Sequence, residues 1–185
     1  IRYQHAELLY ALKKHDLAYD QYMEVVKINP KGKHSRFCAE SAIFAADEMM
    51  KREPKAQPAP GAKKSDPIAL TDWEKNGLAA MVQFEKLFPT DKNTRKIIYR
   101  AAYVYYNKNM FKEASDRFRV VIGMDPKSKE AEQAANLILD SFALVEDWMN
   151  LKDVSKAFFD QQGLGSSDFK KEVFGIYENA SLKLI

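Results

Sequence analysis

Residues 95–128 read RKIIYRAAYVYYNKNMFKEASDRFRVVIGMDPKS, and this stretch decides the fold. Within it, apolar and small residues recur every three or four positions, as they do along one face of a helix. Pro126 follows the second run, where proline cannot supply the next amide donor of a helix. The stretch predicts one helix over about 92–108 and a second over about 111–123.

The pattern of this stretch occurs a second time, near the start of the chain. An ungapped shift of about 96 residues aligns the two copies at small, aromatic and proline positions, where packing dictates the residue type. The aligned pairs are Tyr3 with Tyr99, Ala6 with Ala102, Tyr10 with Tyr106, Ala18 with Ala114, Val25 with Val121 and Pro30 with Pro126. Because one helical hairpin cannot bury its apolar faces alone, neighbouring hairpins are expected to stack on it.

Both copies resemble the tetratricopeptide repeat (TPR) family, whose repeat is two antiparallel helices in about 34 residues. The family's small, aromatic and proline positions match Ala102, Tyr105, Ala114, Phe118 and Pro126 in residues 95–128, and Ala6, Leu9, Ala18, Tyr22 and Pro30 in residues 1–32. The chain departs from the family where tryptophan and leucine are usual, at Ile98 and Arg2 and at Ala101 and His5. The resemblance is therefore good for two repeats and looser elsewhere.

The resemblance implies an all-α fold, a right-handed helical-hairpin solenoid of about four hairpins plus a terminal helix. We expect residues 1–185 to form a single TPR-like domain, with helices near 1–14, 16–29, 34–52, 70–88, 92–108, 111–123, 128–149, 151–162 and 167–183. The last of these helices has no visible partner, which fits either a terminal capping helix or a truncated array. The chain begins at Ile1 inside a helical pattern, so we interpret it as a fragment of a longer protein.

Residues 53–67 interrupt the helical pattern. They hold four of the seven prolines and no large apolar residue, which predicts a flexible Pro/Lys-rich insertion within the second hairpin. Surface loops accept such insertions at little cost. A second interpretation is a mobile arm that touches a partner or a membrane, and the composition does not decide between the two.

Several function classes find no support in the sequence. No histidine pair has zinc-helix spacing, and no carboxylates converge in a catalytic pattern, so we predict no catalytic site, metal or cofactor. His34 and Cys38 lie one turn apart, and we interpret Cys38 as a core residue. With 29 basic and 26 acidic residues and no apolar run of membrane-spanning length, we expect neither a nucleic-acid partner nor a membrane span.

The resemblance places a partner groove along the first helices of successive hairpins. Its positions correspond to Lys96, Tyr99, Arg100, Tyr103, Tyr106 and Asn107 in one repeat and to Tyr3, Glu7 and Tyr10 in the other. Tyrosine is a frequent interface anchor because it offers a large contact area, few rotamers and a hydroxyl. The tyrosines could equally contact the neighbouring hairpin. A bound segment with apolar side chains is expected, since tyrosines replace the lysine and asparagine clamp of some family members.

The sequence thus predicts a non-catalytic scaffold that binds another protein or peptide segment within a larger assembly. The alternatives are a regulatory or targeting domain of a larger enzyme, and a self-association module that forms a homo-oligomer. Residues 85–91, EKLFPTD, resemble a turn common in repeat proteins of the bacterial envelope. That resemblance implies a periplasmic or outer-membrane-associated setting, with the cytoplasm as the alternative.

Overall fold

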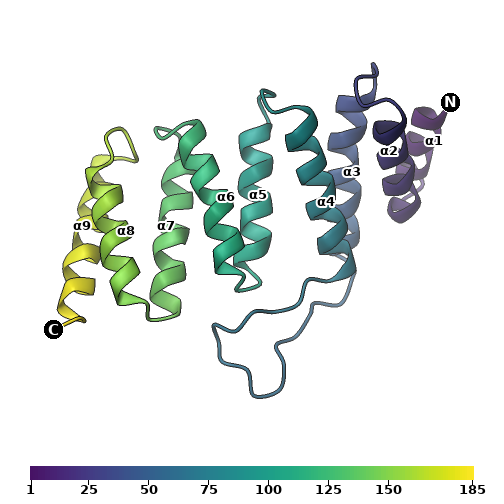
Figure 1. The fold of residues 1–185 in the computed structure, drawn as a ribbon. Coiled ribbons are helices and arrows are strands. Elements are labelled where there is room, and N and C mark those ends of the chain that lie inside the picture. The colour runs from purple at the N-terminus through teal and green to yellow at the C-terminus, as the bar shows by residue number, and fades with distance from the viewer. The chain divides into compact units, whose positions relative to one another are not determined.

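The computed structural model describes residues 1–185 and contains nine α-helices and no strand (Figure 1). The predicted all-α helical-hairpin fold is therefore confirmed. The helices are α1 (Arg2–Ala11), α2 (His15–Ile28), α3 (Ser35–Met50), α4 (Asp72–Leu87), α5 (Thr94–Tyr106), α6 (Phe111–Met124), α7 (Lys129–Leu144), α8 (Trp148–Asp160) and α9 (Ser167–Leu182). None of the nine is long and apolar enough to span a membrane.

The chain divides into two compact units. The first unit comprises Ile1–Gln57 and Ala69–Ile97, and the second comprises Pro58–Ile68 and Ile98–Ile185, so the boundary falls within α5. In the first unit α1 packs on α2, α2 on α3 and α3 on α4; in the second, α6 packs on α7, α7 on α8 and α8 on α9. That residues 1–185 form a single repeat domain stays a prediction.

Three of the hairpin turns share one backbone geometry. Lys13, Asn109 and Glu146 adopt the left-handed conformation, with φ of 58°, 55° and 56°. In each turn the amide of this residue donates to the carbonyl three residues earlier, and the next amide donates to the carbonyl five residues before it. Such paired bonds satisfy the free carbonyls of a helix end. The shift of 96 residues aligns Lys13 with Asn109. The two copies of the repeat therefore share the backbone conformation of this turn as well as the residue pattern.

These turns also explain why some predicted helix ends are wrong. The seventh helix was expected over 128–149, but α7 ends at Leu144 because Glu146 leaves the helical conformation. The carboxylate of Asp147 then accepts a hydrogen bond from the Asn150 amide at 3.1 Å and caps α8, which begins at Trp148 rather than near residue 151. In the same way α1 ends at Ala11, before the left-handed residue that follows.

The small residues of the repeat lie in the core, as predicted. Ala102 on α5, Ala114 on α6 and Phe118 one turn further are completely buried in the second unit. In the first unit Ala18 is completely buried and Tyr22 almost so. Alanine at these positions lets two helices approach closely, and the aromatic ring fills the space one turn away.

The segment from α3 to α4 is anchored where it rejoins the first unit. The Glu53 carboxylate accepts hydrogen bonds from the Thr71 hydroxyl and, at 3.3 Å, from the Trp73 amide. Thr71 and Glu74 form a reciprocal capping box at the start of α4, with amide-to-side-chain distances of 2.8 and 3.3 Å. This cap explains why α4 begins at Asp72.

Within the second unit, the same segment is held by the turn between α5 and α6. The side-chain amide of Asn109 donates to the carbonyls of Lys64 and Asp66, both at 2.8 Å. The Ile68 amide donates to the Lys108 carbonyl, also at 2.8 Å. Residues 64–68 are therefore fixed to this turn, while the flexibility predicted for the whole stretch 53–67 stays a prediction.

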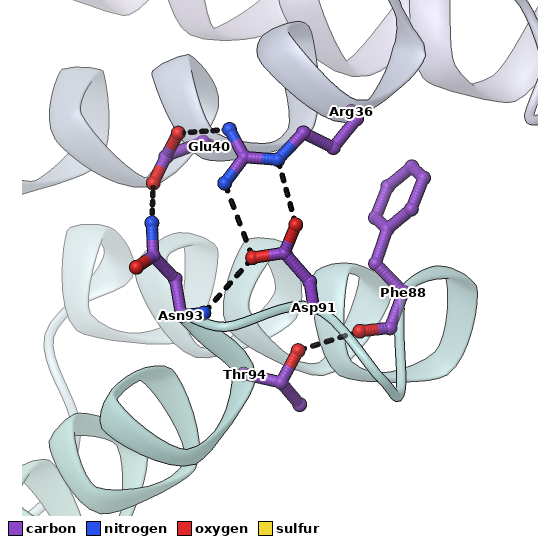
Figure 2. Close-up of polar contacts among 6 residues, drawn as sticks. All are labelled: Arg36, Glu40, Phe88, Asp91, Asn93 and Thr94. Carbon is purple, nitrogen blue, oxygen red and sulfur yellow. Dashed lines mark hydrogen bonds and ion pairs between the residues drawn. The ribbon is translucent and has the colours of Figure 1, made fainter.

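A polar network ties α3 to the turn between α4 and α5 in the first unit (Figure 2). The Arg36 guanidinium donates to both oxygens of Asp91 and, at 2.5 Å, to Glu40. The side-chain amide of Asn93 donates to the other Glu40 oxygen at 2.6 Å, and its backbone amide donates to Asp91 at 2.9 Å. All four side chains thus have partners inside the first unit.

The turns that precede α3 and α5 are built alike. The hydroxyl of Ser35 donates to the carbonyl of Asn29. The hydroxyl of Thr94 donates to the carbonyl of Phe88 at 2.5 Å, as Figure 2 shows. In each turn a proline directly follows the residue whose carbonyl accepts this bond. The hydroxyl bond closes the turn and sets where the next helix begins.

The last helix, α9, packs along α8, as expected of a terminal helix that caps the array. Gly165 permits the intervening turn: its φ is 68°, and an added Cβ would lie 2.3 Å from the Phe169 ring. The Lys170 ammonium donates to three carbonyls at the end of α8, those of Phe158, Phe159 and Gln161, at 2.6 to 2.8 Å. These contacts fix the beginning of α9 to the end of α8.

Candidate functional site

Three of the predicted tyrosines form a ladder along one face of α5. The rings of Tyr99 and Tyr103 are nearly parallel with centroids 6.4 Å apart, and those of Tyr103 and Tyr106 are 6.1 Å apart. The spacing of four and then three residues places all three on the same side of the helix. Tyr103 is 44% exposed, so the middle of the ladder is open to solvent.

The two ends of the ladder are held by neighbouring helices of the second unit. The Tyr99 ring packs at 5.5 Å on Phe118 of α6, and the Tyr106 hydroxyl donates a hydrogen bond to Asp140 of α7. Burial, and then the bond to Asp140, raise the pKa of Tyr106 well above its ordinary value of 10.0. Of the three tyrosines, Tyr103 is thus the one most available to a partner.

A cavity of about 410 Å³ opens between α7, α8 and α9. Its volume lies within the range of small-ligand and side-chain pockets, about 300–1,000 Å³. Most of the lining is apolar, and it is contributed by Leu139, Ala143, Trp148, Leu151, Ile176 and Ala180. An open cavity with such walls exposes apolar surface to water, which is unfavourable until something fills it.

The same cavity has a polar rim. The rim residues are Asn136, Asp140, Asn179 and Lys183. The Lys183 ammonium lies 5.7 Å from the centre of the Trp148 ring. Since Asp140 both lines the cavity and holds Tyr106, it joins the tyrosine ladder to the cavity. We call this surface, formed by the ladder, Asp140 and the cavity, the second-unit groove.

The other residues that the sequence placed in this groove lie apart from the cavity. Lys96 and Asn107 are exposed at the two ends of α5, and Arg100 is half-buried. None of the three lines the cavity. Of the six positions carried over from the family pattern, Tyr99, Tyr103 and Tyr106 contact one another in a continuous row.

The three groove residues predicted in the first repeat lie on α1, in the first unit. Tyr3 stacks on His34 with ring centroids 4.2 Å apart. Glu7 accepts a hydrogen bond from the Tyr22 hydroxyl, and Tyr10 meets the His15 ring edge-on at 4.7 Å. Glu7 and Tyr10 both line a cavity of about 250 Å³.

Sequence reasoning missed the residues that α3 adds to this first-unit cavity. Phe37, Glu40 and Phe44 line it together with the α1 residues. Phe37 and Phe44 are seven residues apart, which places them on one helix face, and both remain nearly half exposed. The spacing of Phe37 and Phe44 was the sequence signal that could have found this cavity, because uncovered apolar residues on one helix face often mark a contact surface.

Cys38 lies in the core of the first unit, as predicted, and is completely buried. Burial, and then the charge of Glu7, raise the pKa of its thiol to about 11. His34, which the sequence places one turn away, is exposed and stacks on Tyr3 instead. No group of three or more His, Cys, Asp or Glu side chains is placed to hold a metal ion.

The chain is similar to solved structures but matches no family model. No protein-family model matches the chain, and no curated protein shows a significant match. Among solved structures, the chain is similar to nearly identical TPR-like repeats from a kinesin light chain candidate of Podospora anserina. The two share 8% identity over 98% of this chain and 84% of that chain, with a TM-score of 0.48. The helices and turns of this chain establish its fold without that similarity.

Proposed function

We propose that this chain is a non-catalytic scaffold whose second-unit groove binds a segment of another protein. The observation that carries the proposal is the open apolar cavity of about 410 Å³ beside the tyrosine ladder. Helical-hairpin repeats commonly serve as binding surfaces, since stacked hairpins present an extended face. The chemistry of the groove defines the kind of segment that it binds.

The cavity suits an apolar anchor side chain of the partner. Trp148 and Leu151 line it from α8, and Ile176 and Ala180 line it from α9. Burying a leucine or phenylalanine side chain in such surroundings contributes about 1.5–3 kcal/mol. One anchor of this kind accounts for a large part of the affinity in many interfaces.

The rim and the ladder suit the backbone of the same segment. Asn136, Asn179 and Lys183 supply side-chain donors for carbonyl or carboxylate oxygens. Tyr103 offers an exposed ring and a hydroxyl one turn from Tyr106. A segment that places an apolar side chain in the cavity can therefore continue over the tyrosines with polar contacts to its backbone.

A peptide-display experiment tests the proposal. Random peptides are selected on the 1–185 chain and then measured against a cavity-filling variant, Asn179→Trp, by fluorescence anisotropy. The matched control is Glu178→Trp, because Glu178 is exposed, is adjacent on α9 and does not line the cavity. We expect selected peptides to share a large apolar residue and to lose at least roughly tenfold in affinity on Asn179→Trp only.

Two outcomes would count against the binding of a foreign segment in the groove. Peptides bound equally by both tryptophan variants would place the interaction elsewhere on the chain. A concentration-dependent increase in mass by light scattering, lost in the cavity-filling variant, would favour self-association over a foreign partner. The bacterial-envelope setting is a separate proposal that rests on the resemblance of residues 85–91 alone, and fractionation of the source cells would test it.

A further inference from the structure

The cavity of the first unit has a different chemistry from the second-unit groove. It measures about 250 Å³, below the usual range of small-molecule sites of about 300–1,000 Å³. Its lining combines the Glu7 and Glu40 carboxylates with four aromatic residues, Tyr10, Tyr22, Phe37 and Phe44. A space of this size and composition is suited to a single side chain rather than to a cofactor.

Glu7 is the carboxylate of this cavity that has no positively charged partner. The buried Tyr22 hydroxyl donates to one of its oxygens, and no cation forms an ion pair with it. The other carboxylate of the lining, Glu40, is already engaged, because Arg36 and Asn93 each donate to one of its oxygens. A half-buried carboxylate without a cation has an unfavourable environment, which an incoming positive charge would improve.

The residues beneath Glu7 experience its negative charge. Burial first, and then the hydrogen bond to Glu7, raise the pKa of Tyr22 above its ordinary value. Burial, and then the charge of Glu7, likewise raise the pKa of the Cys38 thiol. Both groups are thus held in their neutral forms, and neither supplies a positive charge to the Glu7 carboxylate.

The aromatic rings supply the second element of a cation site. Phe37 is 43% exposed and Phe44 is 46% exposed, and both lie on the side of α3 that lines the cavity. A cation within about 6 Å of an aromatic face is attracted by the negative charge density of the ring. Phe37 is also positioned by Tyr3, which contacts its ring edge-on at 5.6 Å.

We propose that this cavity receives an arginine side chain from an extended segment of a partner protein. Arginine fits better than lysine, because its planar guanidinium stacks on aromatic rings while donating two parallel bonds to a carboxylate. Glu7 accepts the guanidinium bonds, and Phe37 and Phe44 flank its plane. This site lies in the first unit and does not depend on the proposed occupancy of the second-unit groove.

Two capped peptides, identical except for a central arginine or its neutral isostere citrulline between alanines, test the proposal. Each is titrated into the 1–185 chain while the ring signals of Phe37 and Phe44 are followed by NMR. We expect the arginine peptide to shift these signals and to bind roughly three- to tenfold more tightly than the citrulline peptide. Added salt should reduce this preference, because it screens the half-exposed charge pair.

Two substitutions sharpen the test. Glu7→Gln keeps an oxygen for the Tyr22 hydroxyl but removes the charge, so it should abolish the preference for arginine; Glu24→Gln, in the same unit but outside the cavity, should preserve it. Phe44→Leu should weaken the arginine peptide roughly two- to fivefold. Equal binding of the two peptides by the parent chain, no shift of either ring, or a preference that survives Glu7→Gln would each overturn the proposal.

Discussion

The guanidinium of Arg36 meets the carboxylate of Asp91 through two hydrogen bonds, from Nε to Oδ2 at 2.9 Å and from Nη2 to Oδ1 at 3.1 Å. The two residues are 55 positions apart in the sequence. This fork joins the start of α3 to the turn that precedes α5, and it does so inside the first unit (Figure 2). Bidentate geometry makes it one of the stronger surface contacts of the chain.

Replacing Asp91 with asparagine should destabilise the first unit. The substituted side chain would retain an oxygen for the backbone amide of Asn93 but lose the charge that Arg36 contacts. Because the Arg36 side chain is 36% exposed and solvent screens the pair, we expect a loss of only about 1 kcal/mol in the free energy of unfolding. Urea unfolding followed by circular dichroism measures it. The control Asp20→Asn, at an exposed position of α2, should change little.

The contribution of Asp91 should also depend on pH. Hydrogen bonds, first from Arg36 and then from the Asn93 amide, hold its pKa below the ordinary value of 3.8. A carboxyl whose pKa is lower in the folded state stabilises the fold above its unfolded pKa, and that contribution is lost as the pH falls through its folded pKa. The difference between the parent and Asp91→Asn should be complete at about pH 6 and vanish toward about pH 2. A constant difference across this range would contradict the assignment.

Removing the Tyr106 hydroxyl should weaken the contact between α5 and α7. Tyr106→Phe leaves the ring in the ladder but deletes the hydrogen bond to Asp140, so we expect a loss of about 0.5–1 kcal/mol. Tyr103→Phe is the matched control, because the exposed ring of Tyr103 belongs to the same ladder and its hydroxyl has no such partner. Thermal unfolding of both variants measures the effect; an equal loss in the two would argue against the bond.

Replacing Asn109 should loosen residues 64–66 from the turn between α5 and α6. Asn109→Gly still accepts a φ of 55°, so the turn between α5 and α6 is retained, but the two bonds to the Lys64 and Asp66 carbonyls disappear. We expect faster tryptic cleavage after Lys63 and Lys64 with unchanged helix content. Lys13→Gly, at the equivalent turn of the first hairpin, should leave the cleavage rate unaltered.

The Cys38 thiol should report on unfolding of the first unit. It is completely buried and its pKa is raised to about 11, so little thiolate is present near neutral pH and reagents cannot reach it. We expect no reaction with Ellman's reagent in the native chain and reaction of one thiol after denaturation. In urea, the onset of labelling should coincide with the onset of the loss of helical circular dichroism. Rapid labelling without denaturant would show that this core opens locally.

The number, type and order of the helices could be predicted from sequence periodicity, because helix faces and proline stops are local properties. The ends of the helices were harder to predict. The left-handed residue that ends a helix is usually glycine, which is visible in a sequence, but here Lys13 and Glu146 adopt that conformation. The preference of such side chains for other conformations is overruled by packing of the hairpin, which a single sequence does not reveal.

For the candidate sites too, local features could be predicted from the sequence and features that depend on helix packing could not. The tyrosine ladder could be predicted, because its spacing on α5 is a property of one helix. The cavity beside it could not, since three helices contribute to it and Trp148 was assigned to the wrong helix. The family pattern also gave no groove positions for α3, so Phe37 and Phe44 were overlooked although their spacing was visible.

Lys170 and Lys171 are adjacent in the sequence but differ in what their ammonium groups contact. The Lys170 nitrogen already donates to three carbonyls, whereas Lys171 extends into solvent with 79% of its side chain exposed and a single contact to Asp168. An acetyl group on Lys170 would remove donors that hold α9 against the end of α8, while one on Lys171 would alter only surface charge. The same enzymatic modification, moved by one residue, would therefore either loosen the last hairpin or leave it intact.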